Sequence, residues 1–180
     1  MDNGLAVELF FDPHTEARIM GLWEKVARVA VGPSMSDIGA RPHISLAVFE
    51  EGNPDQCRVD LRSFAQEIAP IEVMLSYIGV FPSTGVVFIG VVVTDTLLGL
   101  NQSLYNCLTG MGIVSTRYYH PGNWVPHCTV ATALSVEKIA DVLDVCLVSD
   151  VLGPAHLVEI GLVEFRPAYV HYSFPLGGRG

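Results

Sequence analysis

Two short segments of the chain repeat one pattern of residue types. Pro-His-Ile-Ser-Leu-Ala occupies 42–47, and Pro-His-Cys-Thr-Val-Ala occupies 126–131. Their histidines, His43 and His127, are 84 residues apart in a chain of 180. Proline biases the residue before it toward an extended conformation, so each segment is expected to begin a β-strand. A chain with two such strands at matching places is expected to fold as a duplicated structure.

The rest of the hydrophobic pattern predicts a similar succession of elements twice. Alternating or continuous apolar runs indicate strands, and apolar residues three or four apart indicate helices. We expect strands over 5–11, 43–49, 71–81, 86–94, 127–133, 157–165 and 168–174, and helices over about 14–30, 61–68, 97–108 and 135–146. The sequence therefore predicts an α+β fold. Two units of antiparallel strands, each backed by helices, are expected to form one bilobal domain over residues 1–180.

The repeated segments place histidine and hydroxyl side chains together. Alternate residues of a strand share a face, so His43 should emerge beside Ser45, and His127 beside Thr129. Histidine titrates near neutral pH, so one ring can take a proton from water while the other gives a proton to a leaving oxygen. The two hydroxyls can hold the non-bridging oxygens of a phosphate by hydrogen bonds. This set favours acid–base hydrolysis of a phosphodiester, a reaction that requires no metal.

The paired motifs resemble the signature of the 2H phosphoesterase superfamily, which includes the bacterial 2′-5′ RNA ligases and plant-type cyclic nucleotide phosphodiesterases. That signature is two copies of His, any residue, Thr or Ser, and an apolar residue, present here at 43–46 and 127–130. The resemblance extends over nearly the whole chain. It implies a LigT-like fold of two antiparallel sheets lining a central cleft with helices outside. It also implies no metal or other cofactor, and RNA-related phosphoester substrates.

Two features depart from the commoner pattern of that superfamily. The first motif has Ser45 in place of threonine, which preserves the hydroxyl. Some RNA-ligase-like members carry an arginine shortly after the second motif, whereas residues 131–134 here are Ala-Thr-Ala-Leu. The lack of this arginine weakens the case for the exact activity of those members.

The charge of the chain limits its partners. Ten Lys and Arg residues against 19 Asp and Glu give a net charge of −9, whereas proteins that bind long nucleic acids usually carry a basic surface. We therefore expect a small nucleotide or an RNA terminus as partner, and neither long duplex nucleic acid nor a membrane. The longest apolar run, 86–93, is too short to span a bilayer. A cytoplasmic monomer with its four cysteines reduced is the expectation.

Aromatic side chains near the motifs are candidates for substrate binding. Trp124 and Tyr119 lie just before the second motif, where an aromatic ring can stack on a base. Phe49 and Phe81 are at strand ends and can line a base pocket. Ordinary packing is at least as good an explanation for each of these residues.

The remaining basic side chains are weaker candidates. Three arginines are candidates for phosphate contacts, although exposure to solvent is the simpler explanation: Arg41, Arg117 and Arg166. Three histidines are expected in solvent: His14, His120 and His156. Tyr169 and His171 share a face of the last strand, and the sequence does not decide whether that face is core, surface or cleft.

The leading hypothesis is a metal-independent phosphodiesterase that hydrolyses a nucleoside or short oligonucleotide 2′,3′-cyclic phosphate through His43 and His127. Which histidine is the acid depends on which oxygen leaves, and the sequence leaves this open. The alternatives are a 2′-5′ oligonucleotide phosphodiesterase or ligase, an RNA 3′-end processing enzyme, and a binder of cyclic phosphates or RNA termini without turnover. A metal site at the two histidines is least favoured, because no Cys, Asp or Glu accompanies either within its motif.

Overall fold

The chain alternates strands and helices in the order that the sequence predicts. The computed structural model describes residues 4–30, 34–50, 53–165 and 168–177. Its elements are β1 (Gly4–Phe11), α1 (Pro13–Val26), β2 (His43–Phe49), α2 (Pro54–Glu67), β3 (Ile71–Phe81), β4 (Val86–Val91), α3 (Asp95–Gly110), the 3-10 turn η1 (Arg117–Tyr119), β5 (His127–Ala131), α4 (Val136–Leu147), β6 (Gly153–Phe165) and β7 (Tyr169–Pro175). The helix starts follow from local chemistry, as at α1, where Asp12 caps the free N–H groups of His14 and Thr15.

The order of strands in the sheet shows a duplication. All neighbouring strands are antiparallel, in the order β2-β1-β6-β3-β4-β5, and β7 pairs with β6 outside this path. The order is symmetric. If β1 is matched with β4, β2 with β5 and β3 with β6, the sheet has the same order when it is read from either end. The chain is therefore β1-α1-β2-α2-β3 followed by an equivalent unit β4-α3-β5-α4-β6, with β7 added. The predicted α+β class is confirmed.

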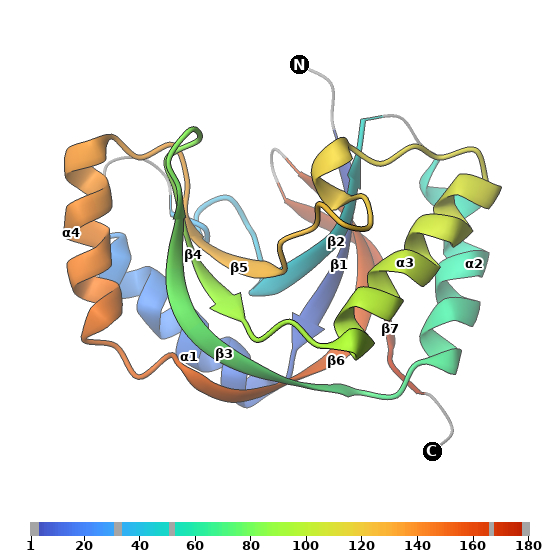
Figure 1. Cartoon of the computed structure of the whole chain (residues 1–180), viewed down its shortest axis with the longest axis horizontal. Coiled ribbons are helices and arrows are strands. Elements are labelled where there is room, and N and C mark those ends of the chain that lie inside the picture. The colour runs from blue at the N-terminus through green and yellow to red at the C-terminus, as the bar shows by residue number, and fades with distance from the viewer. Residues whose placement is uncertain (1–3, 31–33, 51–52, 166–167, 178–180) are drawn as a thin grey trace.

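The two sheets expected from the sequence are joined into one. Gly153 to Leu157 of β6 pair with β3, and Leu157 to Phe165 pair with β1. Strand β6 has 13 residues, which is long enough to serve both lobes in turn. In Figure 1, β3 and β6 run along the base of the molecule and connect β1 and β2 to β4 and β5.

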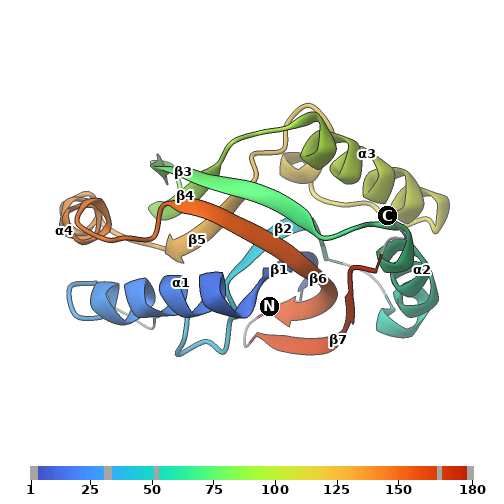
Figure 2. The same cartoon turned by 90° about the horizontal axis from the view of Figure 1, so that it is seen from below.

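The helices are exchanged between the two sequence units. Helix α1 of the first unit packs with α4 and against β5 of the second, and α3 of the second unit packs against β2 of the first. Figures 1 and 2 show α1 and α4 on one flank of the strands and α2 and α3 on the other. Each lobe is therefore built from both units, whereas the sequence pattern suggested that each unit would form its own lobe.

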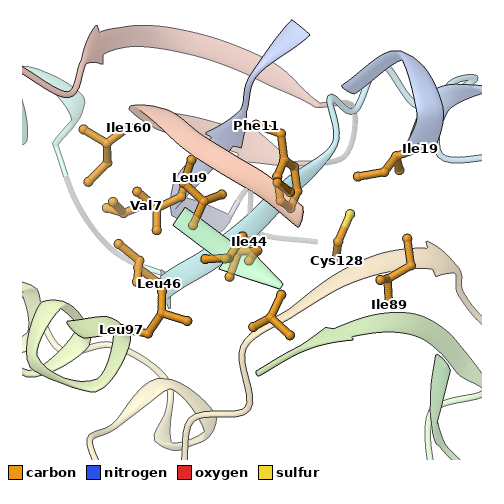
Figure 3. Packing of buried hydrophobic residues seen from close by; sticks show 14 of the residues in the cluster. Val7, Leu9, Phe11, Ile19, Ile44, Leu46, Ile89, Leu97, Cys128 and Ile160 are labelled. Atoms are coloured by element: carbon orange, nitrogen blue, oxygen red, sulfur yellow. The ribbon is translucent and has the colours of Figure 1, made fainter. Parts of the chain in front are cut away.

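The core lies between the strands and these helices. Val7, Leu9 and Phe11 of β1 share one face of the strand, as the alternation predicts, and they are almost completely buried. Figure 3 shows them near Ile44 and Leu46 of β2. Burial of each such side chain contributes about 1.5–3 kcal/mol. Strand β2 is thereby held by its apolar face, and its opposite face is left for the cleft.

Two further sequence expectations concern the whole chain. All four cysteines are free thiols, and Cys57, Cys128 and Cys146 are buried. Within the part of the chain that the structure describes, no helix has the length and apolar character needed to cross a bilayer.

Two tryptophans tie the motif strands to the opposite unit. Trp23 of α1 donates its indole N–H to the Thr129 carbonyl of β5 at 3.1 Å, and Trp124, before β5, donates to the Ser45 carbonyl of β2 at 2.9 Å. Strands β2 and β5 are the two ends of the sheet order, so one edge of each has no strand partner in the part of the chain that the structure describes. The indoles bond to main-chain oxygens on these strands at the hydroxyl residue of each motif.

We expect Trp23→Phe to lower the free energy of unfolding by about 1–3 kcal/mol, because the part-buried Thr129 carbonyl loses its indole donor and keeps only the weak, long contact from the Cys128 thiol. The loss of ring volume adds to this cost. Urea denaturation followed by circular dichroism measures the change. Tyr169→Phe, at a ring that is 59% exposed, is the control and should change the value by less than about 0.5 kcal/mol. Equal stabilities for the two variants would contradict the role of the indole hydrogen bond.

Candidate active site

The two histidines occupy equivalent positions and have equivalent orientations. His43 and His127 are the first residues of β2 and β5, and these two strands lie close together. His43 Nδ1 is 2.6 Å from the carbonyl of Arg41, and His127 Nδ1 is 2.7 Å from the carbonyl of Val125. A carbonyl only accepts hydrogen bonds, so Nδ1 carries the proton in both rings, and Nε2 is the atom left for chemistry.

The motif hydroxyls lie beside the histidines, as predicted. His43 and Ser45 line a cavity of about 260 Å³, and His127 and Thr129 line a second cavity of about 410 Å³. Tyr119 lines both cavities, so the two adjoin. The structure thus brings both motifs to one divided cleft, with two imidazoles and two hydroxyls along it.

The strand partners of the two motifs differ. Ser45 pairs with Glu8 on β1, whereas Thr129 pairs with Phe88 on β4. Glu8 Oε1 lies 3.4 Å from Nε2 of His43. The Phe88 ring lies 5.1 Å from the ring of His127. Equivalent positions of the duplicated site therefore hold a carboxyl on one side and an aromatic ring on the other.

Burial acts differently on the two sides of the cleft. Burial lowers the pKa of His127, and the charge of His43 lowers it further, against the opposing effect of the Val125 carbonyl. Burial raises the pKa of Glu8, while the charges of His43 and Arg41 lower it. His127 is therefore neutral near pH 7, with Nε2 available to accept a proton.

The aromatic candidates have different roles. Phe81 stacks on Phe88 at 4.4 Å and meets the edge of His127 at 5.1 Å, so it forms a wall of the larger cavity. Tyr119 is half-buried between the cavities, and burial raises its pKa despite a hydrogen bond with Ser45. Trp124 also lines the larger cavity, but it is only 7% exposed.

Phe49, a further aromatic candidate, is fully buried in the core and lies in neither cavity. The expectation that Phe49 lines a base pocket is wrong. Simple alternation would place it on the face of His43 and Ser45, but the pairing of β1 with β2 has an irregularity between these residues and Phe49. Beyond the irregularity Val48 lines the cleft, and Phe49 turns into the core. Trp124 fits both the packing and the substrate-binding explanations. It belongs to the hydrophobic core and donates to the Ser45 carbonyl, and it also lines the larger cavity.

Arg41 is neither exposed nor free to bind phosphate. Its guanidinium contacts Glu16 and Glu159, both at 3.1 Å, and lies over the ring of Phe10 at 4.2 Å. These contacts anchor the segment that leads into β2, and the Arg41 carbonyl accepts from His43. Arg41 therefore positions the first motif.

None of the other basic candidates within the described residues lines either cavity. Arg117 is exposed and donates to the Tyr118 hydroxyl, and Arg166 lies outside the described residues. His14 and His156 are exposed as expected. His120 is half-buried instead, because its ring contacts the Ser115 carbonyl at 2.9 Å. His171 is half-buried and pairs with Glu164.

Sequence reasoning missed Glu8. It is the one charged residue in the β1 sequence Gly-Leu-Ala-Val-Glu-Leu-Phe-Phe, on the face opposite to Val7 and Leu9. A carboxyl within a strand that is otherwise apolar on both faces was the available signal. Among the described residues, no group of three or more His, Cys, Asp or Glu side chains is arranged to hold a metal ion.

Comparisons with known proteins support the fold and identify a family. Residues 17–163 match the 2′-5′ RNA ligase superfamily. E. coli LigT in complex with 3′-AMP is similar with a TM-score of 0.66 at 15% identity, over 98% of this chain and 99% of that chain. A Thermus thermophilus structure has a TM-score of 0.63 at 20% identity, over 98% of this chain and 100% of its own. No curated protein matches the sequence. At these identities the structural likeness shows the fold.

We expect the His127 ring to titrate below pH 6.5, the ordinary value for histidine, because burial disfavours the imidazolium. A lowered folded-state pKa means that the unfolded chain binds the proton more tightly, so stability is lost as the pH falls below 6.5. NMR titration of the ring measures the midpoint. Phe81→Ala, which opens the ring to water, should raise the midpoint, and Tyr169→Ala should not. A wild-type midpoint at or above 6.5 would contradict this assignment.

Proposed function

Because the chain belongs to the 2′-5′ RNA ligase superfamily, whose members are phosphoryl-transfer enzymes of the 2H phosphoesterase type, we propose that it hydrolyses the 2′,3′-cyclic phosphate of a nucleoside or short oligonucleotide. The observation that carries the proposal is the matched pair of imidazoles. Each ring is fixed through Nδ1 and leaves Nε2 for proton transfer. Each lies beside a hydroxyl at the same cleft.

The differences between the two sides suggest a role for each histidine. Neutral His127 takes a proton from water as the water oxygen forms a bond to phosphorus. His43, whose Nε2 faces a carboxyl, gives a proton to the ester oxygen as the old P–O bond breaks. The product is a phosphomonoester. The proton from water is then on His127 and the proton from His43 is on the released hydroxyl, and proton exchange with solvent returns both rings to their starting states. Ser45 and Thr129 hold the non-bridging oxygens.

The lining of the cleft favours a substrate with a single negative charge. Arg41 is the only lysine or arginine among the described residues that line the two cavities, and two carboxylates already bind it. Hydroxyls and imidazoles therefore have to hold the phosphate, and they suit a diester monoanion. Phe81, Trp124 and Tyr119 offer apolar surface for a base or ribose.

Related structures support a nucleotide ligand. Solved structures of E. coli LigT hold 3′-AMP and phosphate. A 3′-nucleotide resembles the product of cyclic phosphate hydrolysis in its size and charge. The family description favours one second candidate, cleavage or joining of a 2′-5′ linkage in an oligonucleotide. The same acid and base would serve that reaction. The difference is that the leaving oxygen would belong to a second nucleotide of the oligonucleotide.

We expect the wild type to hydrolyse at least one of the four nucleoside 2′,3′-cyclic phosphates with EDTA present. His43→Ala and His127→Ala should each lower kcat by about 10²-fold or more, the scale of a lost general acid or base. Chromatography of the products measures the rate and shows which oxygen keeps the phosphate. His156→Ala, at an exposed histidine outside the cleft, is the matched control and should keep full activity.

Other outcomes of this experiment are also decisive. Cleavage of a 2′-5′ oligonucleotide with no turnover of the four cyclic phosphates would replace the substrate with the second candidate. Binding of cyclic phosphates without turnover of either class would reject the enzyme proposal. Loss of activity in EDTA would reject the metal-independent mechanism.

A second expectation concerns charge. A 5′-phosphate added to the preferred cyclic nucleotide should lower kcat/KM by about five- to tenfold at low salt, because the part of the cleft lining that the structure describes has no lysine or arginine free to balance the added charge. The difference should shrink at 0.5 M salt, where exposed charges are screened. Paired kinetics of the two substrates at both salt concentrations measure it. A 5′-phosphate that improves kcat/KM would show that a basic subsite exists.

A further inference from the structure

The carboxyl of Glu8 interrupts the symmetry of the duplicated site. Glu8 and Phe88 are equivalent positions, since they pair with Ser45 and Thr129 on the motif strands. They are equivalent on their other side too, where Glu8 pairs with Gly161 of β6 and Phe88 pairs with Gly79 of β3. The fold therefore accepts an apolar ring at this place, and nothing in the strand pairing requires a carboxyl there.

The surroundings of Glu8 are poor for a charge. The residue is only 6% exposed, and its side chain lines the smaller cavity together with His43. Four titratable or charged groups interact with it electrostatically, from the segment before β2, from β2, from η1 and from β5: Arg41, His43, Tyr119 and Cys128. A buried carboxyl is costly unless a partner compensates it.

Of these four groups, His43 is the partner with the closest geometry. Arg41 directs its guanidinium to Glu16 and Glu159, and burial raises the pKa values of Tyr119 and Cys128, which keeps both neutral. Glu8 Oε1 lies 3.4 Å from His43 Nε2, the atom that the Arg41 carbonyl contact leaves available. The carboxyl and the imidazole are therefore placed to share a proton.

We propose that Glu8 is a positioning residue that keeps a proton on the His43 side of the cleft and thereby fixes the direction of the reaction. The inference rests on the proposed phosphodiesterase function. The Glu8–His43 pair holds one proton and releases it to the leaving oxygen, after which the pair regains a proton from solvent. His127, packed against Phe81 and Phe88, has no such reservoir and acts as the base.

This direction places the two parts of the substrate. The ribose oxygen that leaves phosphorus must lie at His43, on the side of the smaller cavity. The rest of the nucleoside can extend along the aromatic side chains of the larger cavity. Attacking water enters on the His127 side, in the larger cavity.

The kinetic test compares Glu8→Gln with the wild type on the cyclic phosphate that the wild type turns over. The amide keeps the shape and removes the negative charge. We expect the alkaline limb of the kcat–pH profile to move to lower pH by about one pH unit, because the acid side no longer retains its proton as firmly. The acidic limb, which reports His127, should stay within a few tenths of a pH unit.

A matched control separates this role from a structural one. Glu72→Gln makes the same change at an exposed site on β3 and should leave the profile unchanged. A general loss of stability in Glu8→Gln would lower kcat at every pH without moving the limb. A Glu8→Gln profile that superimposes on the wild type after scaling would overturn the proposal.

A second measurement needs no turnover. In the wild type, carbon-13 NMR of the Glu8 carboxyl should show a pKa above the ordinary 4.5, and His43→Gln should raise it further because the positive partner is lost. An unchanged midpoint in His43→Gln would overturn the coupling of the two groups. A wild type that is inert on every phosphodiester, with this coupling present, would reject the proposed function and leave the proton-sharing pair established.

Discussion

The placement of the active-site strands depends on hydrogen bonds between the two sequence units. Strand β6 bonds to β3 with one end and to β1 with the other, so neither lobe is complete without the other unit. The indoles of Trp23 and Trp124 add bonds from one unit to the motif strand of the other. Because the histidines begin β2 and β5, their separation is set by this interlocked frame. Loss of these hydrogen bonds would therefore change the positions of both histidine rings.

Duplication supplies two equal strands, but acid–base catalysis needs two unequal groups. In this structure the two histidine rings are held in the same way, and the residues next to them differ. Both imidazoles bond through Nδ1 to a carbonyl two residues earlier. The difference comes from β1 and β4, where Glu8 and Phe88 occupy equivalent places. Under the proposed mechanism, a carboxyl beside His43 and an aromatic wall beside His127 give the two rings different surroundings, so one change of residue type separates the two roles.

The sequence predicts this site well where the information is local. The paired motifs, the face shared by His43 and Ser45, and the element order all follow from periodicity and turn chemistry. The exchange of α1 and α3 between lobes is not predictable in this way, because either packing buries the same apolar stripe. The same holds for Arg41, whose partners lie far along the chain at Glu16 and Glu159. Its anchoring role depends on a tertiary contact that no local pattern encodes.

In a chain of net charge −9, the proposed phosphodiester would be held in the cleft mainly by hydrogen bonds, because the one cation of the described lining is already paired with carboxylates. A free arginine would attract phosphate strongly, yet Arg41 is held by two carboxylates, and its contribution to the cleft is the main-chain carbonyl that orients His43. Hydroxyl and imidazole donors are directional and carry little net charge, so they stabilise a phosphodiester whose charge is spread over two oxygens. They stabilise a dianionic product less well. Under the proposed function, a cleft built from such donors would therefore favour departure of the monoester once the ring of the cyclic phosphate has opened.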